Sequence, residues 1–365
     1  MVGQTLSTHR PPPESALLRT VRALFDGWFN SLFTLVGLVA LVTASVSIVE
    51  WALINAVWSA TSDADCAAKG SGACWAVIRD RYRIIFFGLY PYEQQWRSAV
   101  ACGIALSGIC LSGLPAFWSV ARLPVLWAVV TVSFVALMRG GLFGLPAVAT
   151  EQWGGFTLTV YLYASTVLLG FPLAVALALL RRKRRGVAKH IAAFLVDGVR
   201  TLPSISILFI VAVLAPFVLP AWALPDKLTR LVLAFALVFA CYEAEIVRAG
   251  LQTIPVGQDE AARALGLRYP GRVRFVLLPQ GLKNTLPSSV NLFLSTFKET
   301  SIVSVIGFFE FTASAQAAYG NAAWANAYLE VYLFVGLVYF LCTLGLASYG
   351  LWLERAVNVE RKREK

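Results

Sequence analysis

The chain has 365 residues, of which 58% are hydrophobic and only 14% are charged, and its formal net charge is +11. Soluble domains average about a quarter charged residues, so this composition indicates a membrane protein. The basic residues gather beside apolar runs, which favours a role in membrane topology over binding to nucleic acid. The sequence contains no G-x-x-x-x-G-K-[ST] motif and only two histidines. We therefore expect no ATPase site in this chain, no metal site, no cofactor and no catalytic residue.

The first 30 residues are expected to form a lead on the cytoplasmic side, and residues 1–20, with three consecutive prolines, are expected to be unstructured. A signal peptide is the alternative for the first apolar run. That run exceeds the usual 7–15 apolar residues of a signal peptide, and about 30 residues precede it, so we favour a membrane span.

About eight apolar stretches reach the roughly 20 residues that a helix needs to cross a bilayer. In chain order they are 31–54, 98–117, 123–138, 156–180, 202–220, 229–249, 288–307 and 328–352. Eight spans put the basic N-terminal segment, the 181–189 loop, the 250–287 loop and the C-terminal tail on one side. Basic residues prefer the cytoplasmic side. We therefore predict an all-α integral membrane protein with both termini in the cytoplasm.

The first outward-facing loop, 55–97, contains Cys66 and Cys74. In an oxidising compartment these residues can form a small disulfide, but two unpaired thiols fit the sequence equally well. The other four cysteines lie in apolar segments and are expected to be buried and inert.

Two blocks follow the N-terminal lead. Residues 31–150 hold three spans and the long outer loop and contain no chemical motif. Residues 151–355 hold five spans, and the Gly- and Pro-rich segment 139–155 marks the boundary. A basic cytoplasmic tail, 356–365, ends the chain.

The most informative segment is the cytoplasmic loop 250–287, in which residues 260–279 read EAARALGLRYPGRVRFVLLP. Residues 258–265 are rich in good helix formers, and the alanines allow close approach by a partner. Gly266 can adopt the left-handed conformation that ends a helix. An amphipathic helix lying on anionic lipid is the alternative. It accounts for the basic residues, but not for the alanines, the spaced glycine or the Leu-Pro pair.

This spacing (E-A-A, three residues, G, nine residues, then a V-L-L-P end) resembles the ATPase-coupling loop of ABC-importer permease subunits. The segments EIVRAGLQTIPVGQ before it and FKETSIVSVIG after it are similar to the polar amino-acid branch of that family. A chain of this length with three extra N-terminal spans most resembles the second permease subunit of general L-amino-acid importers. One departure is LVDGVRTLPSIS at 195–206, where Asp197 and Arg200 keep the charges but Thr201 replaces the usual glycine.

The resemblance implies a type I ABC-importer permease core in the bacterial inner membrane, working with separate ABC ATPase subunits, a second permease subunit and a periplasmic amino-acid-binding protein. It also assigns the coupling role to particular residues of the loop. These are Glu260, Ala261, Ala262, Gly266, Leu278 and Pro279.

Charged residues inside the predicted spans are costly in lipid and usually face a cavity or a partner. In the seventh span, Asn291, Ser295 and Lys298 recur at helical spacing and form a polar stripe, with Glu299 beside it. An amino acid carries both a carboxylate and an ammonium, so Lys298 is a candidate for binding the carboxylate. Glu243 and Glu245 on the sixth span are further pathway candidates. The alternative is a structural ion pair between Lys298 or Glu299 and the sixth span.

Two other function classes remain open at this point. An ATP-independent channel or secondary transporter explains the spans and the intramembrane charges, but it leaves residues 260–279 unexplained. An integral-membrane enzyme requires clustered catalytic residues at one interface, and the sequence contains no such cluster.

Overall fold

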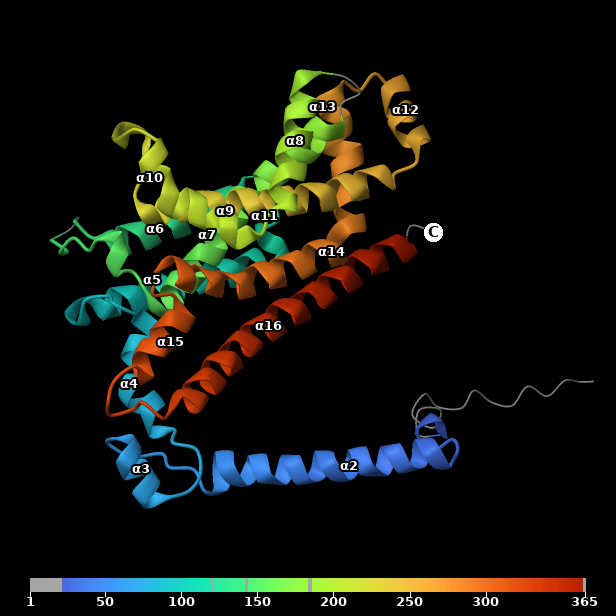
Figure 1. Ribbon diagram of the computed structural model, residues 1–365. Coiled ribbons are helices and arrows are strands. Elements are labelled where there is room, and N and C mark those ends of the chain that lie inside the picture. The colour runs from blue at the N-terminus through green and yellow to red at the C-terminus, as the bar shows by residue number, and fades with distance from the viewer. Residues whose placement is uncertain (1–21, 120, 142–143, 183–185, 364–365) are drawn as a thin grey trace, which may run out of the picture. The chain divides into compact units, whose positions relative to one another are not determined.

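The computed structural model describes residues 22–119, 121–141, 144–182 and 186–363 (Figure 1). The chain divides into two compact units, Met1–Ala76 and Val77–Lys365, which are described separately below. Most of the predicted cytoplasmic lead, residues 1–21, and the last two residues of the tail lie outside the described part of the chain.

The first unit contains one long apolar helix, α2 (Trp28–Val49), which a short π-helical turn extends to Ile54. A small folded loop follows, built on α3 (Asp63–Lys69) and capped by Ser62, whose hydroxyl accepts a hydrogen bond from the backbone N–H of Asp65. A disulfide joins Cys66 to Cys74, which decides between the two alternatives left by the sequence.

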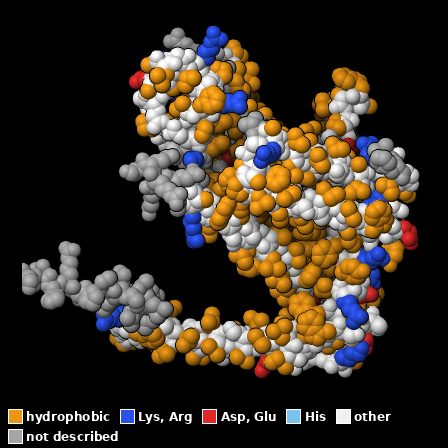
Figure 2. All heavy atoms as spheres, turned by 180° about the vertical axis from the view of Figure 1, so that it is seen from behind, with side chains coloured by type: hydrophobic (Ala, Val, Ile, Leu, Met, Phe, Trp, Pro, Cys, Tyr) orange, Lys and Arg blue, Asp and Glu red, His pale blue; other side chains and the backbone are white. Residues whose placement is uncertain are grey.

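Over its described residues, the regular structure of the second unit consists of helices, apart from one isolated β-bridge between Gly155 and Glu310. Its helices are α4 (Ala76–Phe87), α5 (Gln95–Ser112), α6 (Arg122–Arg139), α7 (Gly155–Arg182), α8 (Val187–Thr201), α9 (Ser204–Phe209), α10 (Ala215–Val218), α11 (Lys227–Gln252), α12 (Val256–Ala264), α13 (Tyr269–Arg272), α14 (Leu278–Glu299), α15 (Phe311–Tyr319) and α16 (Tyr328–Arg363). Hydrophobic side chains cover much of the visible face of this unit (Figure 2). The all-α membrane class predicted from composition is thereby confirmed.

Each of the eight predicted spans coincides with a helix or a helical segment. Four helices, α2, α6, α7 and α16, are long and apolar enough by themselves to cross a membrane. Helix α8 and the α9–α10 segment are together long and apolar enough for a fifth span, but the chain bends by 108° between them. The remaining helices carry more polar and charged residues, so the count of eight spans stays a prediction.

Helix α11 lies at the centre of the second unit and packs against α7, α8 and α14. Small residues make these crossings close. At Gly170 on α7, an added Cβ would lie 2.6 Å from the ring of Phe239 and 2.9 Å from the carbonyl oxygen of Ala236, both on α11. Lipid tails are as apolar as leucine, so helices in a membrane associate through such close packing rather than by escaping water. The loop between α11 and α14 therefore starts and ends on firmly packed helices.

Candidate functional site

The predicted coupling loop forms a short helix, α12, that extends past the end of the helix bundle (Figure 1). Of its residues only Ala262 is buried, whereas Glu260, Ala261 and Ala264 are exposed. Leu265, the residue that follows the helix, exposes 82% of its surface. The end of the bundle therefore carries a short, mostly solvent-exposed helix whose surface includes small alanine side chains.

Gly266 ends this helix as its position in the sequence predicts. Its φ of +79° lies in the left-handed region that favours glycine. The backbone N–H of Gly266 donates to the carbonyl of Arg263 at 2.9 Å, and that of Leu267 donates to the carbonyl of Ala262 at 3.1 Å. These two bonds satisfy carbonyls that the helix end would otherwise leave unpaired.

The Leu-Pro pair that closes the motif lies at the start of α14. The π-helical turn Val273–Leu277 runs directly into this helix, so Pro279 lies inside a continuous helical run, where a proline lacks the N–H of one helical hydrogen bond. Leu278 packs against the buried cluster around α11, while Pro279 remains exposed. The motif therefore spans from the protruding α12 to the point where the chain re-enters the bundle.

The polar stripe lies on the face of α14 that this chain leaves uncovered. Asn291 and Lys298 are exposed, and Ser295 and Glu299 are half-buried. The buried side of α14 carries a different set of residues: Gly281, Thr285, Ser289, Thr296 and Phe297. The four candidates on α14 thus lie at or beside a surface rather than inside the fold of a single chain.

Glu243 and Glu245 have separate environments, although only one residue stands between them. Glu243 is fully buried between α11 and α14, and its Oε1 lies 2.7 Å from the hydroxyl oxygen of Ser289. Among the residues that the structure describes, its other carboxyl oxygen has no hydrogen-bond partner. Within the described residues, neither Glu243 nor Glu245 forms an ion pair with Lys298.

Glu245 is the centre of an ion-pair cluster that joins three helices. Its carboxylate accepts hydrogen bonds from Nε of Arg248 at 3.0 and 3.1 Å and lies 3.1 Å from Nη1 of Arg181 on α7. Arg181 also lies 3.0 Å from Asp197 on α8, and Arg200 approaches Glu245 at 4.0 Å. The i, i+3 spacing of Glu245 and Arg248 was visible in the sequence. The participation of Arg181, which the sequence shows only as part of a basic run, was not.

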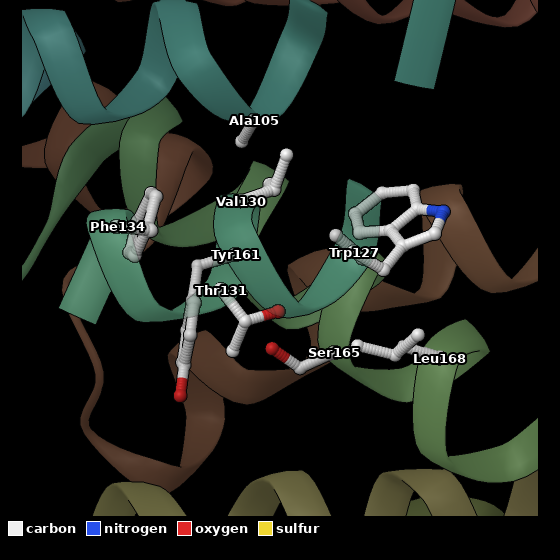
Figure 3. Close-up of a pocket in the computed structure, with 9 residues that line it drawn as sticks. Ala105, Trp127, Val130, Thr131, Phe134, Tyr161, Ser165 and Leu168 are labelled. Atoms are coloured by element: carbon white, nitrogen blue, oxygen red, sulfur yellow. The ribbon is translucent and has the colours of Figure 1, made fainter. Parts of the chain in front are cut away.

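A pocket lies between α5, α6 and α7, where Trp127, Thr131 and Phe134 face Tyr161 and Ser165 (Figure 3). Its lining contains no charged side chain. A site for a zwitterionic amino acid needs groups that pair with both charges, so this pocket is a poor candidate for one. Among the described residues, no group of three or more His, Cys, Asp or Glu side chains is placed to hold a metal ion.

Comparison with known proteins finds relatives that are membrane permeases, in agreement with the helical bundle and the exposed α12 described above. The chain is 35% identical to the inner membrane amino-acid ABC transporter permease protein YhdY of Escherichia coli, over 98% of this chain and 99% of that protein. It is 30% identical to the glutamate/glutamine/aspartate/asparagine transport system permease protein BztC of Rhodobacter capsulatus, over 97% of each. A crystal structure of an amino acid ABC transporter with histidines contains a chain that is 32% identical, with a TM-score of 0.49, covering 55% of this chain and 92% of that one.

Residues 167–359 match the family described as binding-protein-dependent transport system inner membrane component. That range includes α11, the complete predicted coupling loop and α14. The resemblance to ABC-importer permeases is therefore confirmed, and the chain belongs to the family of inner membrane components of binding-protein-dependent transport systems.

Proposed function

We propose that this chain is one permease subunit of an ATP-driven importer of polar L-amino acids. The observation that carries the proposal is α12, a bare helix with exposed alanines that links two packed helices at the end of the bundle. The names of the full-length relatives support the substrate class. The absence of a P-loop from the sequence means that ATP is hydrolysed by a separate subunit.

In this proposal α12 docks into a cleft of the ATPase. Ala261 and Ala264 allow close approach, Leu265 supplies an apolar contact and Glu260 supplies a charge for a basic or amide group of the partner. Movement of the ATPase then displaces α12, and the displacement reaches α11 and α14. This chain itself carries out no covalent chemistry.

The translocation path is proposed to run along the stripe of Asn291, Ser295 and Lys298. These residues lie on an uncovered face, so a second permease subunit is needed to enclose the path. Lys298 attracts the substrate carboxylate, and Glu299, beside it, attracts the ammonium. Glu243 and Glu245 belong to this proposal only as residues that hold the helices behind the stripe. A periplasmic binding protein delivers the amino acid from outside.

The topology follows from the same proposal. Both termini and α12 face the cytoplasm, and the loop 55–97 faces the periplasm, where the Cys66–Cys74 disulfide is stable. Residues 31–150 form an accessory region, and residues 151–355 form the permease core.

The test is ATP hydrolysis in proteoliposomes that contain this chain, its candidate ATPase and an amino-acid-loaded binding protein. Gly266→Asp places a side chain in the left-handed conformation and a carboxylate on the docking surface, so stimulation by the binding protein should fall to the basal rate. Gly141→Asp is the matched control, because Gly141 also has a φ of +79° and a Cβ there also meets no atom within 4 Å, but it follows α6, outside the predicted coupling loop.

Wild-type stimulation that Gly266→Asp abolishes and Gly141→Asp preserves supports the proposal, provided that each variant inserts in the membrane. Uptake of labelled polar amino acids at full rate without any ATPase would contradict it and favour a channel or secondary transporter.

A further inference from the structure

Helix α12 needs support from outside itself. It has nine residues, and isolated helices shorter than about 12–15 residues are marginal in water. Only Ala262 is buried, so packing against the bundle contributes little to its orientation. A helix with so few contacts would tilt when the ATPase displaces it, and the displacement would not reach α11 and α14.

One ion pair joins α12 to the segment that leads into α14. Oδ1 of Asp259 lies 2.9 Å from Nε of Arg272 on α13. These two atoms are buried and are not aligned as a hydrogen bond, so the attraction is mainly between the charges. The side chains of Asp259 and Arg272 expose only 22% and 12% of their surface. Such shielding strengthens an ion pair relative to one in open solvent.

Each member of the Asp259–Arg272 ion pair has one further contact. The guanidinium of Arg272 lies 5.7 Å from the centre of the Tyr269 ring, which restricts its orientation. Arg263, on the same helix as Asp259, approaches the other carboxylate oxygen at 3.7 Å, but its side chain is 63% exposed. Arg272 is therefore the shielded partner of Asp259, and Arg263 is the solvated one.

The connection beyond Arg272 is continuous. Residues Val273–Leu277 form a π-helical segment that passes directly into α14, and Val273 and Leu277 belong to the buried cluster around α11. An ion pair with Arg272 therefore connects α12 to the start of α14 through an unbroken helical segment. Glu260, the neighbour of Asp259, is exposed and stays available to a partner.

We propose that Asp259 and Arg272 form a clamp that locks the coupling helix to the base of α14, so that displacement of α12 moves α14 instead of bending the loop. Both are positioning residues, and neither touches the substrate. This inference rests on the proposed function, because it assigns a role to the pair within the coupling step. Glu260, Ala261 and Ala264 make contact with the ATPase, whereas Asp259 and Arg272 determine how that contact is transmitted.

The test is a charge-swap cycle read as amino acids transported per ATP hydrolysed, in the same proteoliposomes. Asp259→Arg and Arg272→Asp should each lower this ratio by about fivefold, the factor expected when an interaction of about 1 kcal/mol is lost. The double variant, which restores opposite charges, should return the ratio to within about twofold of wild type. Co-purification of the ATPase should be unchanged throughout.

Neutral variants guard against misfolding caused by two like charges. Asp259→Asn and Arg272→Gln should lower the ratio in the same direction, and Arg263→Gln should lower it less, because Arg263 is the solvated partner. A wild-type ratio in both neutral variants would overturn the clamp, as would equal losses for Arg263→Gln and Arg272→Gln.

Failure of the clamp and failure of the proposed function give different results. If the wild-type chain shows no ATP-dependent transport with its ATPase, the importer proposal fails. If wild type is coupled and the variants are coupled equally well, only the clamp fails.

Discussion

Two carboxylates on α11 illustrate how position along one helix decides the role of a residue. Glu245 is surrounded by Arg181, Arg200 and Arg248, and it holds α7, α8 and α11 together where the chain leaves α11 for the coupling loop. Glu243 faces α14, and within the described part of the chain its carboxylate accepts a hydrogen bond from the Ser289 hydroxyl alone. A rotation of about 200° separates residues two apart on a helix, so the two carboxylates point to different neighbours.

Glu245→Gln should destabilise the chain. The amide cannot balance the charges of Arg181 and Arg248, and leaving a partly buried charged group without its partner costs about 1–3 kcal/mol. The measurement is thermal unfolding of the purified chain in detergent, with a lower melting temperature expected for the variant. Glu151→Gln is the control, because Glu151 is exposed. An unchanged melting temperature for Glu245→Gln would show that the cluster contributes no net stability.

At the scale of helices, the pair α11 and α14 forms a hairpin that carries the coupling loop at its tip. The two helices approach closely where Gly250 faces Gly281 and Thr285, and a Cβ at Gly250 would overlap both the Gly281 carbonyl and the Thr285 methyl group. The Glu243–Ser289 contact joins the same two helices further along. The hairpin is therefore fastened at two levels behind the polar stripe.

Gly250→Ala should separate these helices. The backbone carbonyl of Gly281 cannot rotate out of the way as a side chain can, so the helices must shift, and overpacking of this kind costs about 1–3 kcal/mol. Thermal stability in detergent should fall, and coupled transport should fall with it. Gly345→Ala on α16 is the matched control, because a Cβ there meets no atom within 4 Å. Equal stability of the two variants would contradict the close crossing.

At the scale of the whole molecule, membrane orientation connects the disulfide loop with the coupling loop. The proposed topology puts Cys66 and Cys74 outside and α12 inside. In a background without the other four cysteines, a membrane-impermeant maleimide should label Cys66 and Cys74 in reduced, intact cells. Glu260→Cys should be labelled only after the cells are permeabilised. Labelling of Glu260→Cys in intact cells would reverse the orientation and rule out docking of a cytoplasmic ATPase at α12.

Local patterns in the sequence were sufficient for the membrane class and for the positions of the helices, including the short helix α12 in the predicted coupling loop. Apolar length predicts a helix in lipid because every backbone polar group must be satisfied within the segment. The end of α12 near Gly266 was also predictable, since the left-handed conformation is a property of that single residue. The E-A-A motif was therefore recognisable from its residue types and spacing as a resemblance to permease coupling loops, and its coupling role stays a prediction.

Only the tertiary structure decided which partners distant residues choose. It showed that Asn291 and Lys298 lie on an uncovered face of α14, that Glu245 pairs with Arg181, and that Asp259 pairs with Arg272. Helical spacing groups residues on one face, but the direction of that face depends on how neighbouring helices pack. The sequence by itself thus determined the membrane class and, through its resemblance to ABC-importer permeases, the family, because apolar length and motif spacing are local properties of the chain. The tertiary structure decided which charges hold the helices together and which remain at the surface, because packing brings together residues that lie far apart in the chain.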